Sequence, residues 1–367
     1  MTDEQHHRFP WRTTAVVVIV VVLASVVAGV LLSRDRVETA DAPVATASAS
    51  ASSTVAPTPI PLVDQRQVTL LLTVRDAARA AVSTVLVGVG GDTGFVAELM
   101  LPRDLLLPTV PPMRLEEVDD PTGSRTPEQP IETLLGVQVD VILDLDRLAW
   151  AGLIDATGSR VDATAAENPA AFPLVLDRVL KGLPYDEETV GELLTGLGSM
   201  ARTTVTNEDA SYVLAEVGRH LRSLDVRRET LPVTYLRAGE ARVAVTDLAA
   251  ATSVTRELFP LALLEPGHSG PLRVVLQRAG ATIGAATSAR LGLVAAGLGV
   301  VEDRAEVPSV AATQVVVPDS SEASQAAGRD VATTLGLPAS AVTVSAVPDA
   351  AVDVRVLLGS DAAVTAP

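Results

Sequence analysis

The sequence predicts an α/β protein with an N-terminal transmembrane helix, a larger domain whose central sheet is covered by helices, and a smaller C-terminal α/β module. Three observations support this prediction. A long uncharged apolar run stands near the N-terminus, strand-like and helix-like patterns alternate after residue 66, and a Pro-Gly pair at 266–267 interrupts that alternation. The expected parts are a cytoplasmic tail 1–12, a membrane helix 13–32, a tether 33–61, a first domain 62–265 and a second domain 271–361.

Composition excludes several classes of protein. The 367 residues contain no cysteine and carry a net charge of −17. Nucleic-acid binding is excluded as a function, because contacts with phosphates need a surplus of Lys and Arg. The missing cysteine excludes disulfides, Cys-ligated metals, Cys nucleophiles and a lipidated cysteine.

The apolar run Thr13–Leu32 predicts a membrane anchor. It has 20 residues without a charge, and a helix of that length spans about 30 Å of hydrocarbon. A cleaved signal peptide is the alternative, but its apolar region normally has only about 7–15 residues. Two arginines lie on each side of the run, so Lys/Arg bias leaves the orientation open. We expect a single-pass protein of the cell membrane whose C-terminal domains are extracytoplasmic.

The segment from 33 to 61 is rich in Ala, Ser, Thr and Pro. It contains too few large apolar side chains to bury a core, so we expect a flexible tether. The remaining chain has a net charge of −16 and does not adhere to anionic lipid, which leaves the helix as the attachment.

Three short β-branched runs open the first domain: Val68–Val74, Thr84–Val89 and Phe95–Leu101. The glycine cluster Gly90–Gly94 joins the last two. A phosphate-binding loop is one interpretation of this cluster, but no Lys-bearing helix start follows it. The pattern therefore favours a hairpin turn.

The next helix is predicted from its ends. Thr126 is the expected N-cap, with Pro127 at the first helical position and Gln129 completing a capping box. Gly136 is expected to end this helix.

A strand Val137–Leu143 and a helix Arg147–Ala156 are expected next. Asp144 and Asp146 resemble an acidic metal-binding pair, because alternation places both carboxylates on one face. The favoured interpretation is that Asp146 caps the following helix.

The segment Glu208–Leu224 has a helical pattern that includes His220. Because no other His, no Cys and no acidic residue at i+4 spacing is found beside it, His220 is interpreted as a surface residue, not a metal ligand. Four arginines in and after this helix predict either an anion site or a solvated helix face with its exit turn, the second being favoured: Arg219, Arg222, Arg227 and Arg228.

The second domain is predicted to contain two helices, about 283–297 and 322–335, with Asp319 as a cap and Gly336 and Pro338 as stop signals for the second helix. The expected strands are Leu272–Gln277, Gln314–Val317, Val342–Val347 and Val352–Leu358.

Arg103, Asp104 and Arg114 are the candidate pyrophosphate-binding residues. Arg103 and Asp104 follow the strand Phe95–Leu101, and Arg114 follows a proline-rich turn. Two arginines at the end of a sheet can hold a pyrophosphate, and an aspartate beside them can hold a divalent ion. An Arg–Asp pair that only fixes a loop is equally consistent with these residues. No hydrolytic motif of the HExxH or GxSxG type occurs in the chain.

Two stretches resemble the LytR-CpsA-Psr family: FVAELMLPRDLLLP with MRLEEV, and IETLLGVQVDVILDLDRLAWAGLIDATG. The segment Leu272–Asp361 resembles the LytR C-terminal domain. The resemblance implies a membrane-anchored phosphotransferase of the Gram-positive cell envelope that moves a glycopolymer from polyprenyl pyrophosphate to peptidoglycan with Mg²⁺ or Mn²⁺. Arg103, Asp104 and Arg114 match the family's pattern.

The sequence also departs from that family. Thr73-Val74-Arg75 replaces its "GSD", Ala81–Thr84 replaces its "RSDT", Glu116 replaces the asparagine of "RLN", and Gln277-Arg278 replaces the "NG" of the C-terminal module. The loss of two carboxylates removes implied metal ligands, and Glu116 repels pyrophosphate.

These departures favour a non-catalytic envelope protein that binds or scaffolds wall glycopolymers or partner proteins, with no confident catalytic residue, metal site or cofactor. The alternative is an active phosphotransferase that uses Mg²⁺ or Mn²⁺.

Overall fold

The computed structural model describes residues 66–118, 127–238, 241–264, 270–305, 307–345 and 352–362. They belong to a compact unit that spans residues 57–367. The predicted tail, membrane helix and tether, and the predicted cap Thr126, lie outside the described residues. In the described ranges, no helix is both long and apolar enough to span a bilayer.

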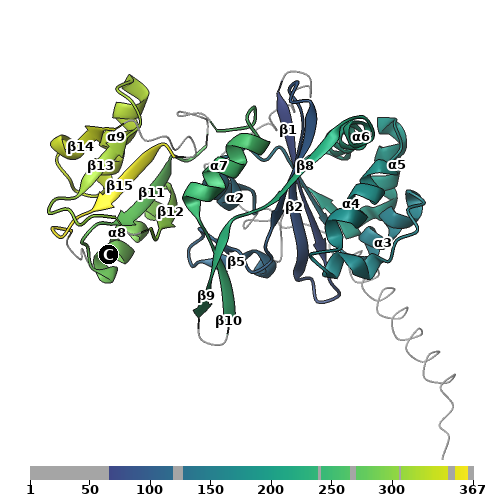
Figure 1. Cartoon of the computed structure of the whole chain (residues 1–367), viewed down its shortest axis with the longest axis horizontal. Coiled ribbons are helices and arrows are strands. Elements are labelled where there is room, and N and C mark those ends of the chain that lie inside the picture. Colours follow the sequence, from purple (N-terminus) through teal and green to yellow (C-terminus); the bar gives the residue numbers. More distant parts are fainter. Residues whose placement is uncertain are drawn as a thin grey trace, which may run out of the picture. The chain divides into compact units, whose positions relative to one another are not determined.

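A six-stranded mixed sheet forms the centre of the first folded part, in the order β7-β6-β1-β2-β3-β8 (Figure 1). Neighbours β1–β2, β2–β3 and β6–β7 are antiparallel, whereas β1–β6 and β3–β8 are parallel. The strands are β1 (Gln67–Arg75), β2 (Ala81–Gly90), β3 (Phe95–Leu101), β6 (Val141–Leu145), β7 (Ala201–Thr203) and β8 (Asp225–Thr230).

Helices cover both faces of this sheet, and each face has its own apolar core. This arrangement explains why every residue of β1 and β2 is buried and why apolar residues occupy both faces of these strands without strict alternation. One face packs against α3 (Arg147–Ala156), α4 (Phe172–Lys181), α5 (Glu187–Leu197) and α6 (Asn207–Ser223), and the other against α2 (Glu128–Leu135) and α7 (Leu248–Leu258).

The hairpin prediction for Gly90–Gly94 is confirmed. The turn joins the antiparallel strands β2 and β3. Gly90, Gly91 and Gly94 have φ values of 86°, 65° and 71°, a region that glycine adopts without steric cost. The cluster is therefore a turn.

Two predicted boundaries in this part were wrong. Helix α2 begins at Glu128, with Pro127 as its N-cap and no side-chain cap bond, although Gly136 ends it in the left-handed conformation as predicted. Strand β6 begins at Val141, because Val137 instead forms an isolated bridge with Leu263. The helix Arg147–Ala156 and its cap Asp146 are confirmed, since the Asp146 carboxylate accepts hydrogen bonds from the Leu148 and Ala149 amides.

Helix α6 begins one residue earlier than predicted and is capped by Thr206. The region after residue 159 also contains elements that the sequence patterns did not predict. Besides α4, α5, α7, β7 and β8, these include the hairpin strands β9 (Val233–Ala238) and β10 (Ala241–Thr246). Short elements elsewhere are β4 (Leu106–Leu107), β5 (Met113–Arg114) and the 3₁₀ turns η1 (Leu115–Glu117), η2 (Ala163–Glu167), η3 (Gly198–Met200) and η4 (Ala339–Ala341).

The C-terminal part has a five-stranded sheet in the order β12-β11-β15-β13-β14, with two helices. The predicted elements are present with shifted ends, but strand β12 was missed and the cap of α9 is Ser321 in place of Asp319. Asp319 instead accepts a hydrogen bond from the Ser321 amide. The elements are β11 (Arg273–Arg278), α8 (Ile283–Ala295), β12 (Gly299–Asp303), β13 (Gln314–Val317), α9 (Glu322–Thr334), β14 (Val342–Val344) and β15 (Val354–Leu358).

Candidate functional site

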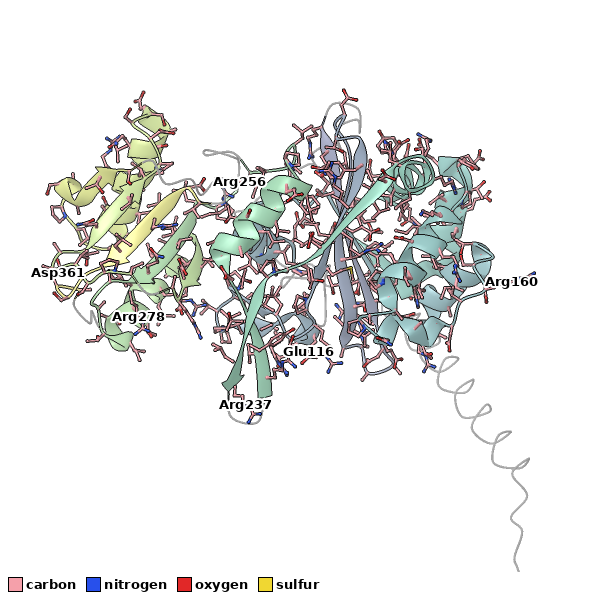
Figure 2. The ribbon with its side chains drawn as sticks, viewed as in Figure 1. Glu116, Arg160, Arg237, Arg256, Arg278 and Asp361 are labelled. Atoms are coloured by element: carbon pink, nitrogen blue, oxygen red, sulfur yellow. The ribbon has the colours of Figure 1, made fainter. Side chains whose placement is uncertain are left out.

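The predicted residues Arg103 and Arg114 come together, and a carboxylate lies with them. Arg103 Nε is 3.2 Å from Glu116 Oε2, and Arg114 Nη1 is 2.6 Å from Glu116 Oε1. The side chain of Glu116 is 14% exposed, whereas that of Arg103 is 60% exposed. Glu116, labelled in Figure 2, thus binds both guanidinium groups in the way that a phosphate oxygen would.

Arg114 has a second carboxylate partner. Its Nε and Nη2 donate to Glu117 Oε1 over 2.9 and 2.7 Å, and its backbone amide donates to Glu117 Oε2. The side-chain hydrogen bond from Arg114 lowers the pKa of Glu117 and raises the pKa of Arg114. Both partners therefore remain charged at neutral pH, and Arg114 is held by two carboxylates.

Asp104 lies beside a different element. Its carboxylate is 3.9 Å from Arg242 Nε of β10, and its backbone carbonyl accepts a hydrogen bond from the Ala244 amide. Arg242 also stacks over Tyr235 of β9, with 3.5 Å between the guanidinium carbon and the ring centroid. The hairpin that brings Arg242 to Asp104 was not predicted. Asp104 therefore connects the β9–β10 hairpin to the loop after β3.

The positions where the resembled family has aspartates carry other groups. Arg75 Nε donates to Asp144 Oδ1 over 2.6 Å, and each of these two side chains is 3% exposed. Ser83 Oγ donates to the Ala166 carbonyl oxygen over 2.6 Å. A guanidinium and a committed hydroxyl donor do not fit a divalent cation, which needs oxygen acceptors. In the ranges that the structure describes, no group of three or more His, Cys, Asp or Glu residues could hold a metal ion.

Asp144 and Asp146 do not form the acidic pair that their spacing resembles. Asp144 is buried on the sheet and paired with Arg75, whereas Asp146 caps α3. Burial raises the pKa of Asp144, and the Arg75 charge and hydrogen bond oppose that increase. The two carboxylates thus have separate structural roles.

His220 lies at the surface of α6 with its side chain 20% exposed. Its Nδ1 lies 2.9 Å from the Glu216 carbonyl oxygen and 3.6 Å from Glu216 Oε2. The carboxylate one turn earlier on α6, at i−4, was the overlooked sequence signal.

Each of the four arginines around the end of α6 is held by other protein groups, and Tyr185 is a shared partner of Arg219 and Arg222. This arrangement does not favour a common anion site built from all four. Arg219 pairs with Glu216, and Arg222 donates to the Lys181 and Leu183 carbonyl oxygens. The remaining two lie on β8: Arg227 stacks over the Phe95 ring at 4.0 Å, and Arg228 binds Glu98 and Asp177 at 2.6 Å each. Arg219 and Arg227 are exposed, as the favoured interpretation expects, whereas Arg222 and Arg228 are partly buried.

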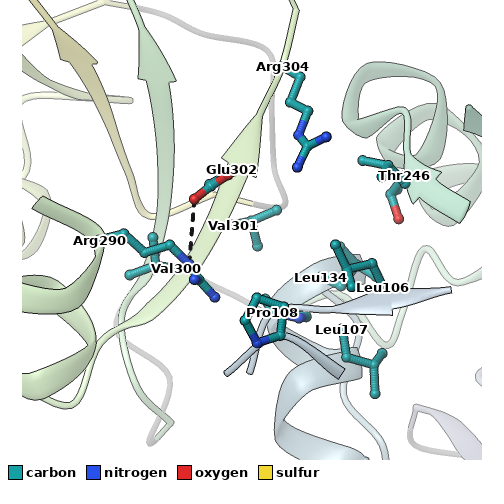
Figure 3. Close-up of a pocket in the computed structure, with 12 residues that line it drawn as sticks. Leu106, Leu107, Pro108, Leu134, Thr246, Arg290, Val300, Val301, Glu302 and Arg304 are labelled. Atoms are coloured by element: carbon teal, nitrogen blue, oxygen red, sulfur yellow. Dashed lines mark ion pairs between the residues drawn. The ribbon is translucent and has the colours of Figure 1, made fainter. Parts of the chain in front are cut away.

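Figure 3 shows a cavity of about 80 Å³ where the loop 105–113 meets the C-terminal part. Its charged lining residues are Arg290, Glu302 and Arg304. Arg290 is 3.6 Å from Glu302 and donates to the Thr109 carbonyl oxygen over 2.7 Å. The walls are mainly apolar, including Leu106, Leu107, Leu134, Val300 and Val301. Because the cavity is small and Arg290 is already paired, this region is a packing contact between the loop and α8.

No protein-family model and no curated protein matches the sequence. Among solved structures, the chain is similar to a transcriptional regulator from Enterococcus faecalis, with 14% identity and a TM-score of 0.44 over 54% of this chain and 90% of that one. It is also similar to two B. subtilis proteins. TagU gives 13% identity and a TM-score of 0.41 over 54% of this chain and 97% of its own. TagT gives 10% identity and a TM-score of 0.40 over 55% of this chain and 94% of its own. TagT and TagU are LytR-CpsA-Psr proteins.

Proposed function

We propose that this chain is a LytR-CpsA-Psr-like protein of the Gram-positive-type cell envelope that binds or scaffolds wall glycopolymers or envelope proteins without catalysing their transfer. In this proposal Thr13–Leu32 anchors the chain in the cell membrane, and the domains after the tether are extracytoplasmic. The sequence stretches that resemble the family support the assignment, and the mixed α/β sheet with helices on both faces is consistent with it.

One observation carries the non-catalytic part of the proposal. Glu116 binds both Arg103 and Arg114, the two arginines that match the family's pyrophosphate-binding residues. A pyrophosphate at this position would have to displace Glu116 and would be repelled by it and by Glu117. The residues best placed to stabilise a departing phosphate are therefore neutralised by the chain itself.

The absent carboxylates support the same conclusion. Arg75 and Ser83 stand at the positions of the implied metal ligands, and both are engaged with other groups. A cation cannot be held beside the Arg75 guanidinium without overcoming charge repulsion. The chain thus lacks a metal-assisted route for phosphoryl transfer at these positions.

The test is an activity assay of the full chain in detergent with a polyprenyl pyrophosphate and either Mg²⁺ or Mn²⁺. We expect no phosphate release or glycopolymer transfer above buffer, together with co-sedimentation of the chain with isolated cell walls. Turnover that disappears in Arg103→Ala would establish the alternative, an active phosphotransferase. A reporter fused after Pro367 tests the topology, and a cytoplasmic signal would contradict the extracytoplasmic location.

A further inference from the structure

A second cavity, of about 220 Å³, lies on one face of the C-terminal sheet and contains none of the candidate residues Arg103, Asp104 and Arg114. Strands β11, β12 and β15 line it from one side, and the first turns of α7 and the end of α2 line it from the other. Its polar lining residues are Thr133, Thr252, Gln277, Asp303 and Arg355, and its larger apolar lining residues are Leu134, Leu248, Val275, Val301 and Val352.

Gln277 gives this cavity a chemical preference. Its side chain is buried, at 2% exposure, and its amide nitrogen donates to Asp303 Oδ2. This bond distinguishes the nitrogen of the Gln277 amide from its oxygen, because the reverse orientation would place the amide oxygen against the Asp303 oxygen. The amide oxygen is then a buried acceptor that receives no hydrogen bond from any residue in the described ranges. Such an acceptor destabilises the fold unless a donor reaches it.

Opposite charges flank Gln277 on the neighbouring strands. Asp303 is its register partner on β12, and Arg355 lies on β15 as the register partner of Val275. Register partners and alternate residues of a strand point to the same face of a sheet, so all three polar side chains face the cavity. Asp303 and Arg355 are two strand spacings apart across the sheet and two residues apart along it, which places their Cα atoms about 12 Å apart. A small zwitterion fits between a carboxylate and a guanidinium at that separation.

We propose that this cavity binds a free amino acid with an apolar side chain. The amino group donates to Gln277 Oε1 and pairs with Asp303, the carboxylate pairs with Arg355, and the side chain packs on the valine and leucine wall. Neither an apolar compound without a donor nor a simple carboxylate, which is acceptor-only at neutral pH, satisfies the buried Gln277 oxygen. The binding site is separate from the arginines of the proposed function, so either proposal can fail without the other.

The test is calorimetric titration of the full chain in detergent with L-leucine, D-leucine and isovalerate, which lacks the amino group. We expect either leucine enantiomer to bind at least tenfold more tightly than isovalerate. Gln277→Leu should weaken leucine binding at least tenfold, because the variant removes the hydrogen bond that the charged amino group donates to Gln277. Gln138→Leu is the matched control, since the Gln138 side chain is exposed, and it should leave binding unchanged.

A second variant keeps the test decisive if Gln277→Leu does not fold. Ala249 is an exposed residue of α7 that lines the cavity, so Ala249→Trp should block entry while the Gln277–Asp303 bond remains. Loss of leucine binding in a variant with an unchanged melting temperature supports the proposal. The absence of leucine binding at 50 mM, equal binding of isovalerate, or unaltered binding in both variants would overturn it.

Discussion

Arg75 and Asp144 form a buried ion pair across adjacent strands of the central sheet. The Arg75 Nε atom lies 2.6 Å from Asp144 Oδ1, and the two side chains are each 3% exposed. Asp144 is the register partner of Thr73 on β1, and Thr73 Oγ1 lies 3.3 Å from Thr84 Oγ1 of β2. At this end of the sheet, where the sequence resembles a metal site, the charged side chains and the hydroxyl groups are therefore paired with each other.

Removing one partner of this ion pair should be strongly destabilising. Arg75→Met leaves Asp144 buried without its cation, and we expect a loss of about 3–5 kcal/mol in the free energy of unfolding. Urea denaturation of the full chain in detergent measures this loss. The double variant Arg75→Met with Asp144→Leu should recover much of the stability, because replacement of both charges by apolar groups is often neutral. The exposed Arg178→Met is the control and should change stability by less than about 0.5 kcal/mol.

Glu116→Gln should make the two arginines available to anions. The substitution removes the negative charge from the position between Arg103 and Arg114 but keeps the shape of the side chain. We expect inorganic pyrophosphate to bind roughly two- to fivefold more tightly, since exposed charge pairs contribute about 0.2–1 kcal/mol. Calorimetry at low salt measures the affinity. Glu188→Gln, at an exposed position on α5, should have no effect, and equal affinities for Glu116→Gln and the unchanged chain would show that Glu116 does not exclude anions.

The buried carboxyl of Glu98 should make stability depend on pH. Burial, followed by the charge of Asp177, raises the pKa of Glu98 to about 7, although Arg228 opposes the increase. The folded chain therefore binds a proton more tightly than the unfolded chain, whose glutamate has a pKa near 4.3. Protonated Glu98 contributes its full stabilisation at a pH below the pKa of the unfolded chain. This stabilisation is lost as the pH rises through the folded-state pKa of about 7.

Glu98→Gln tests this pH dependence. We expect the variant to match the unchanged chain near pH 4.5 and to gain relative stability as the pH rises to 7.5, when Glu98 ionises. Melting temperatures across that range provide the measurement. Burial also raises the pKa of Glu132 to about 7, so part of the pH dependence should persist in the variant. A constant stability difference between the two proteins at every pH would contradict the assignment to Glu98.

The core between the central sheet and helices α3 to α6 depends on the contact between Trp150 and Phe172. Their ring centroids are 6.0 Å apart, and both side chains are almost completely buried. Phe172→Ala should cost about 3–5 kcal/mol, because the surrounding core cannot collapse into the space. Leu174→Ala on the same helix is the control, since Leu174 is 67% exposed and should cost less than about 0.5 kcal/mol. Thermal unfolding compares the two variants.

Several features of the chain could be predicted locally. Strands β1, β2 and β3 follow from β-branched apolar runs, the turn between β2 and β3 from its glycines, and the start of α3 from Asp146. These signals depend on backbone dihedrals and hydrogen bonds within a few residues. The edge strand β8 was missed because its sequence, DVRRET, is polar and mostly outside the core, and β12 was missed because it is a short run beside glycines.

The sequence by itself determined the α/β class. It also determined most of the strands and helices of the first 90 described residues and of the C-terminal part, and it identified the arginines that are candidates for binding. Only the tertiary structure decided what those arginines bind. Glu98 and Arg228 are 130 residues apart, and Arg75 and Asp144 are 69 apart, so their pairing depends on strand order and register, which no local pattern encodes. Glu116 is close to Arg114 in sequence, but its contact with Arg103 requires the turn between β4 and β5. Charge partners thus follow from topology, because an ion pair forms wherever the folded backbone brings opposite charges within a few ångströms.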